Sequence, residues 1–124
     1  MHIADYASIS QSGTLSIVGI FNAMNTPSVP FIQPKIVAVI GLFVDEGDEN
    51  ETSTLTAILR DPEGRVLREN AMDLQIQNRD PLNPKINLII DFPLLTLNEI
   101  GFHELEIWID NEQQEQIGFD LRKI

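Results

Sequence analysis

The sequence contains no cysteine, and this absence excludes several kinds of site at once. A thiolate nucleophile, a Cys-x-x-Cys zinc site and a disulfide framework all require cysteine. The chain also lacks any nonpolar run long enough to span a membrane. Its first residues lack the basic and nonpolar regions of a secretory signal. These absences suit a reducing compartment, and we expect a cytoplasmic protein.

Positively charged residues are scarce, with 8 Lys plus Arg against 19 Asp plus Glu, so that the net charge is -11. Duplex nucleic acid and anionic membranes repel such a chain, so we expect neither as a partner. Solubility is the simplest explanation of this acidity, although it also suits basic partners or cations.

Familiar catalytic patterns are missing as well. The chain has no Gly-x-Ser-x-Gly elbow, phosphate-binding glycine loop, dinucleotide glycine pattern or His-Glu-x-x-His sequence. Of its two histidines, His2 lies at the terminus and His103 lies on a nonpolar strand face, where a hydrogen-bonded core histidine is more common than a ligand or a base. A glycosidase-type carboxylate pair stays open, but no pair is selected. We expect no enzyme, no catalytic residue and no cofactor.

What the sequence does contain is a repeated strand pattern. Residues 103–109 alternate nonpolar and polar, Asp110 and Asn111 suit a tight turn, and 115–121 returns with nonpolar residues on one face. Residues 61–64 read Asp-Pro-Glu-Gly, a second hairpin turn. About eight such strands, with turns every eight to twelve residues, predict one domain over residues 1–124. The expected fold is an antiparallel two-sheet β-sandwich of immunoglobulin-like or C2-like Greek-key type.

Two strands are nonpolar on both faces, residues 14–22 and 35–44. Such a strand is expected to be covered on both sides. For 35–44 the cover is either the proline-rich segment 26–34, read as a crossover loop, or another copy of the chain. We therefore predict an interaction surface that includes Val37, Val39 and Phe43.

Two local irregularities are also predicted. The nonpolar positions change phase after Leu67, so we place a bulge near residues 68–71, where the chain could pass between sheets. Pro93 is expected to end the strand that begins near residue 85.

Two features suggest ligands. The acidic segment 45–51 offers hard oxygen ligands for calcium, and its weak candidates are Asp45, Asp48, Glu49 and Glu51. Its spacing does not match an EF-hand, and a solvated loop is the simpler interpretation. Trp108 shares a strand face with glutamates and could contact a protein or a sugar, or could cover neighbouring strands.

The amino-terminal segment 4–22 carries a resemblance. Its Asp-Tyr-Ala, Gly-x-Leu and Gly-Ile-Phe motifs resemble those of a family of small uncharacterised bacterial proteins. A proline segment and a late glycine-aromatic strand before a closing hairpin are also similar, although His103 stands where that family has an aromatic residue. The resemblance implies a compact β-sandwich of unknown function, with no catalytic residues to transfer.

These observations lead to two functional hypotheses. In the first, the chain is a non-enzymatic cytoplasmic protein of unknown process that acts through protein contacts, with a second copy of itself as the expected partner in a homodimer or larger assembly. In the second, it is a ligand-binding module for calcium or a carbohydrate, and the identity of any small ligand is unknown.

Overall fold

The computed structural model is built from β-strands in two sheets, and it describes residues 1–43, 52–75 and 85–124. No helix within these ranges is long and nonpolar enough to cross a membrane. The strands of the described residues are β1 (His2–Ile9), β2 (Leu15–Ile20), β3 (Ala23–Thr26), β4 (Phe31–Phe43), β5 (Thr52–Arg60), β6 (Val66–Gln75), β7 (Lys85–Leu97), β8 (Gly101–Ile109) and β9 (Glu112–Lys123).

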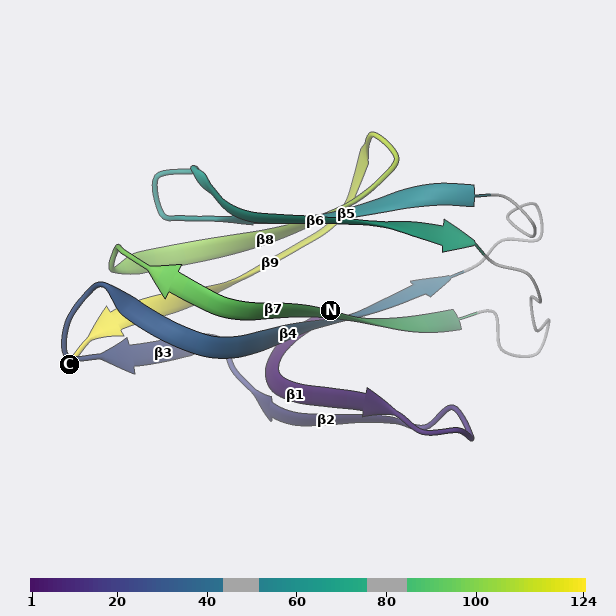
Figure 1. The fold of residues 1–124 in the computed structure, drawn as a ribbon, viewed down its shortest axis with the longest axis horizontal. Helices are drawn as coiled ribbons and strands as arrows, with labels where there is room; N and C mark the ends of the chain where they lie inside the picture. Colours follow the sequence, from purple (N-terminus) through teal and green to yellow (C-terminus); the bar gives the residue numbers. More distant parts are fainter. Residues whose placement is uncertain (44–51, 76–84) are drawn as a thin grey trace.

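The strands form two layers, as expected for a β-sandwich (Figure 1). One sheet has the order β2-β1-β4-β7, and each pair of neighbouring strands in it is antiparallel. The other has the order β3-β9-β8-β5-β6, and β3 lies parallel to β9 in it. The predicted β-sandwich is therefore confirmed, while the second sheet is mixed rather than wholly antiparallel.

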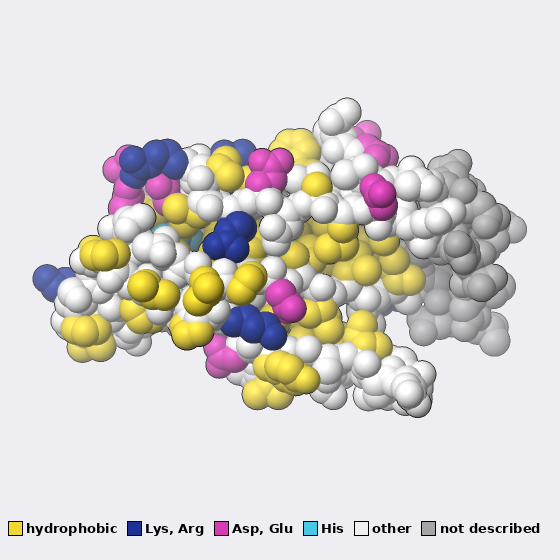
Figure 2. All heavy atoms as spheres, viewed as in Figure 1, with side chains coloured by type: hydrophobic (Ala, Val, Ile, Leu, Met, Phe, Trp, Pro, Cys, Tyr) yellow, Lys and Arg dark blue, Asp and Glu magenta, His cyan; other side chains and the backbone are white. Residues whose placement is uncertain are grey.

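The main core lies between the inner faces of the two sheets. In β4 the alternate residues Ile36, Ala38 and Ile40 point into it, which is the period of a strand. Leu105 and Ile107 of β8 meet them from the other layer. Figure 2 shows hydrophobic side chains between the layers on the face where β6 and β7 lie. Each fully buried isoleucine or leucine side chain contributes about 1.5–3 kcal/mol to stability.

The closing hairpin forms as the sequence predicts. Its β8 residues His103, Leu105 and Ile107 are buried, and β8 pairs with β9 along almost its whole length. Asp110 adopts a left-handed φ of 53° at the turn, a conformation that Asp tolerates better than most residues.

The two predicted irregularities differ from their expected positions or effects. Leu59 pairs with Arg68 but Arg60 pairs with Val66, so the extra residue of the bulge is Leu67, one before the predicted range. The strand then stays in its own sheet. The prediction that Pro93 ends its strand is wrong, because β7 continues to Leu97. Since β7 is an edge strand, a residue without an N–H is tolerated there.

The proline-rich segment is also more regular than expected. Only residues 27–30 connect β3 to β4, because β3 reaches Thr26 and β4 begins at Phe31. The predicted crossover loop 26–34 is therefore shorter than the sequence suggested, and it does not cover the outer face of β4.

Candidate functional site

The hairpin of β1 and β2 separates from the rest of its sheet soon after the chain begins. β1 pairs with β4 only from His2 to Ala4, although its pairing with β2 continues to Ile9. The bend lies at Asp5 and Gly19. Gly19 has a φ of 72°, and a Cβ there would overlap the Asp5 side chain. Figure 1 shows β1 curving away from β4 so that the hairpin lies below the sheet.

A small second core fills the space between this hairpin and the outer face of β4. Ala4, Val37 and Val39 are buried in it. The partly buried residues packed around them are Ala7, Leu15, Ile17 and Ile89. The chain's own amino-terminal hairpin therefore covers the face that we expected a proline loop or a second copy to cover.

This packing corrects two members of the predicted interaction surface. Val37 is 0% exposed and Val39 is 3% exposed within a single chain, so neither lies on the surface. Phe43, at the end of β4, is 76% exposed. Trp108 is half-buried on β8 and donates a hydrogen bond from Nε1 to Oε1 of Glu106 at 3.3 Å.

The other side of the hairpin is open to solvent, and several of its exposed residues are nonpolar. Tyr6 and Val18 are opposite each other on β1 and β2, and both are more than half exposed. Ile20 is also exposed. The Lys35 ammonium lies 5.6 Å from the Tyr6 ring, at cation–π distance. We call Tyr6, Val18 and Ile20 the hairpin surface.

The sequence suggested that both faces of residues 14–22 would be covered, and for Val18 and Ile20 this was wrong. The available signal was the nonpolar second face itself. A nonpolar face predicts burial, but an exposed nonpolar face also marks an interaction surface.

β2 is the outermost strand of its sheet, and its sequence is unusual for such a position. Leu15–Ile20 reads Leu-Ser-Ile-Val-Gly-Ile, with no charged residue and no proline. Natural edge strands normally carry charges, prolines or other protection, because unpaired N–H and C=O groups can bind another strand. The positive φ of Gly19 is the irregularity that β2 carries.

The edge of β7, at the other end of the same sheet, is protected by side chains of β6. Nη1 of Arg68 donates to the Pro93 carbonyl at 3.0 Å, and Nη2 donates to the Leu94 carbonyl at 3.3 Å. Nδ2 of Asn70 donates to the Asp91 carbonyl at 3.3 Å. These bonds occupy part of the edge and join the two sheets.

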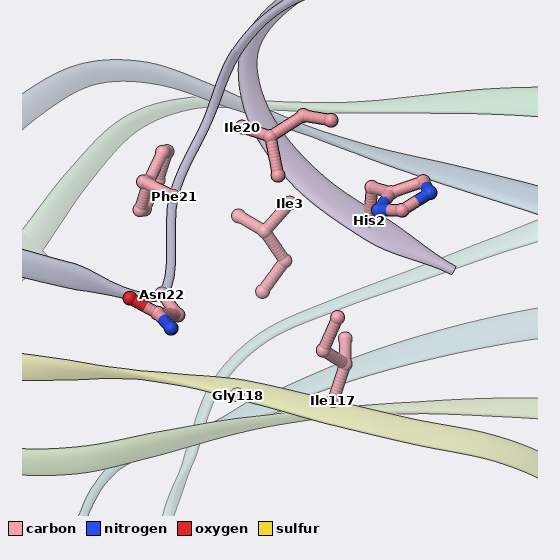
Figure 3. Close-up of a pocket in the computed structure, with 7 residues that line it drawn as sticks. All are labelled: His2, Ile3, Ile20, Phe21, Asn22, Ile117 and Gly118. Carbon is pink, nitrogen blue, oxygen red and sulfur yellow. The ribbon is translucent and has the colours of Figure 1, made fainter.

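A shallow hollow of about 260 Å³ lies where the hairpin turns away from the second sheet. Figure 3 shows Ile3, Ile20 and Ile117 pointing toward one another across it. Its other lining residues are His2, Phe21, Asn22 and Gly118. With His2 as its one ionisable side chain, the hollow favours nonpolar contact over acid-base chemistry. It adjoins the hairpin surface through Ile20.

The ionic cluster at the predicted turn 61–64 has a structural role. Oδ1 of Asp61 accepts hydrogen bonds from the backbone N–H groups of Glu63 and Arg65, both at 2.9 Å. Oδ2 accepts from Nε of Arg65 at 2.8 Å, and Arg65 also binds Glu99 beyond β7. Burial raises the pKa of Asp61, but the hydrogen bonds outweigh it and hold that pKa below its usual value. Through the ion pair of Arg65 with Glu99, the cluster connects the β5–β6 turn to the segment between β7 and β8.

His103 is a core histidine, as its position on a nonpolar face indicated. It is 0% exposed, and its ring stacks on Phe119 with centroids 5.1 Å apart. Nδ1 lies 3.1 Å from the Gly101 carbonyl, while Nε2 has no hydrogen-bond partner among the residues that the structure describes. Burial lowers the pKa of His103, although the Gly101 carbonyl and the charge of Asp61 favour the protonated form.

We therefore expect the free energy of unfolding to decrease as the pH is lowered, because His103 becomes protonated more easily in the unfolded chain. In the unfolded chain a histidine has a pKa of about 6.5. Because the pKa of His103 is lower when folded, its contribution to stability is complete above about pH 7 and is lost as the pH falls below about 6.5. The slope can reach about 1.4 kcal/mol per pH unit. Urea unfolding between pH 7.5 and 5 measures it.

His103→Phe keeps an aromatic ring against Phe119 and removes the titration, so this variant should have a flatter profile over the same range. His2→Phe is the matched control, and it should keep the slope because His103 is still present. An unchanged slope in His103→Phe would contradict the assignment.

The predicted calcium candidates Asp45, Asp48, Glu49 and Glu51 lie outside the described residues. Within residues 1–43, 52–75 and 85–124, no group of three or more His, Asp or Glu residues is arranged to hold a metal ion.

These features define the chain as a two-sheet β-sandwich with an exposed nonpolar surface on its amino-terminal hairpin. The chain belongs to a family of unknown function (DUF6941), whose model matches residues 1–122. Membership of an uncharacterised family, expected from the amino-terminal resemblance, is thereby confirmed. Comparison with curated proteins and with solved structures gives no match.

Proposed function

We propose that this protein is a non-enzymatic cytoplasmic protein that acts through protein contacts and associates with a second copy of itself. The observation that carries the proposal is the hairpin surface, where Tyr6, Val18 and Ile20 are each more than half exposed. Exposed nonpolar side chains grouped on one element favour a binding surface over isolated exposure. Tyr6 adds an aromatic ring, a residue type enriched in interfaces.

Charge also favours this surface for self-association. Two copies with a net charge of -11 each repel one another, so their contact is most favourable where charged residues are absent. β2 has none. The absence of cysteine fits the proposed cytoplasmic location.

The solution mass of the protein, measured by light scattering from about 5 to 200 µM, tests the proposal. We expect a dimer or larger assembly at the upper end of this range. Ile20→Glu, which brings a carboxylate to the hairpin surface, should weaken association by at least about tenfold. Ile32→Glu is the matched control, because Ile32 lies on β4 and is 62% exposed against 57% for Ile20.

Three outcomes would contradict the proposal in different ways. A monomer at every concentration would overturn self-association. If Ile32→Glu dissociated the assembly and Ile20→Glu did not, the contact would lie near Ile32 on β4 rather than on the hairpin. A rise in mass or melting temperature only with millimolar calcium, abolished by Asp45→Asn with Asp48→Asn, would favour the ligand-binding alternative instead.

A further inference from the structure

We infer that two copies associate by antiparallel pairing of β2 with β2 of the second copy, across a two-fold axis. The four-stranded sheets would then join into one sheet of order β7-β4-β1-β2-β2-β1-β4-β7. This inference rests on the proposed self-association and specifies its geometry.

The open edge of β2 defines the chemistry of its partner. β2 pairs with β1 on one side, and within the described residues no strand pairs with its other side. The outward N–H and C=O groups of such an edge are satisfied by water or by another extended backbone. A strand from a partner is therefore the occupant that fits the edge, with nonpolar side chains such as Val18 and Ile20 beside it.

A second copy offers few edges that could meet β2. Part of the β7 edge is occupied, because Arg68 and Asn70 donate hydrogen bonds to three of its carbonyls. β6 carries Arg68, Glu69 and Asp73 along its length. β3 has only four residues. Among the edges of the described sheets, β2 is therefore the best partner for β2.

Pairing of a strand with its own copy has a defined symmetry. Antiparallel alignment places the same residues on both sides of a two-fold axis, so the contact is isologous and closes at two copies. It also brings together two uncharged strands. The carboxylate of Asp5 lies against Gly19 from the neighbouring strand β1 rather than on the edge itself.

Cysteine cross-linking can test the pairing directly, because the chain has no cysteine of its own. We would prepare Ser16→Cys, Val18→Cys and Ile20→Cys and oxidise each with oxidised glutathione. A disulfide needs Cα atoms about 4.4–6.8 Å apart, so the residue nearest the two-fold axis should form a covalent dimer best. Val66→Cys is the matched control, since Val66 begins β6 and is 50% exposed against 58% for Val18.

We expect at least one β2 variant to form the covalent dimer about tenfold faster than Val66→Cys. A second variant tests the contact without oxidation. Val18→Lys places a charge beside the edge, as natural edge strands do, and should make the protein a monomer. Val66→Lys should not. The melting temperature of Val18→Lys should match that of the wild-type protein at concentrations where the wild type is itself monomeric.

The outcomes distinguish a failure of β2 pairing from a failure of self-association. If the wild-type protein is a dimer that survives Val18→Lys, and no β2 cysteine cross-links faster than Val66→Cys, β2 pairing is overturned while self-association stands. A mass that grows beyond two copies would also overturn the closed pairing. A wild-type monomer would overturn both this inference and the proposed function.

Discussion

Val37→Asp is expected to reduce the free energy of unfolding by about 3–5 kcal/mol, enough to unfold much of a marginally stable domain. Val37 is 0% exposed beneath the amino-terminal hairpin, with Ala4 and Val39 around it. A carboxylate placed there would lose its hydration and gain no hydrogen-bond partner from these side chains. Urea denaturation followed by circular dichroism measures the loss.

Phe43→Asp is the matched control for this substitution. Phe43 belongs to the same strand but is 76% exposed, so the change should cost less than about 0.5 kcal/mol. If instead the loss in Val37→Asp diminished as protein concentration rose, or if this variant folded normally and changed only the mass, the face would be covered by another copy rather than by the hairpin.

Phe119→Ala is expected to destabilise the main core by about 3–5 kcal/mol, through lost burial and the cavity that remains. Phe119 is fully buried on β9 and lies at the centre of three aromatic rings. It stacks on His103 and meets Phe21 edge-on, with centroids 6.0 Å apart and planes at 66°. Since Phe21 directly follows β2, the substitution should also loosen the base of the hairpin.

Phe102→Ala is the corresponding control, because Phe102 is 51% exposed on β8 beside β9. Its cost should stay below about 1 kcal/mol. Thermal unfolding of both variants measures the difference. Equal losses would contradict the assignment of Phe119 to the core. Amide hydrogen exchange at β1 and β2 should rise in Phe119→Ala and stay near the wild-type rate in the control.

The parts of the fold that local chemistry controls were predictable from the sequence. The alternation of residues 103–109 correctly placed His103, Leu105 and Ile107 on a buried face. Asp110 and Asp61 marked two turns because their short side chains suit left-handed backbone or bond to nearby N–H groups. Each of these predictions depends on residues within a few positions of one another.

The candidate site was only partly predictable. The sequence indicated correctly that the strands around Val18 and Val37 are nonpolar on both faces. It could not indicate which of those faces is covered. In the structure the hairpin bends at Gly19, so that Val37 becomes buried and Val18 stays exposed. The predicted surface therefore contained two residues that the chain itself covers, and it omitted Val18 and Ile20.

The sequence by itself determined the strand-rich character, the closing hairpin and the core position of His103, because strand period and turn chemistry act over short distances. Only the tertiary structure decided that β3 joins β9 in parallel, that β7 continues through Pro93 at a sheet edge, and that the outer face of β4 is covered by β1 and β2. The physical reason is that periodicity reports the polarity of each face of a strand, whereas its partner is selected by packing between segments far apart in the chain.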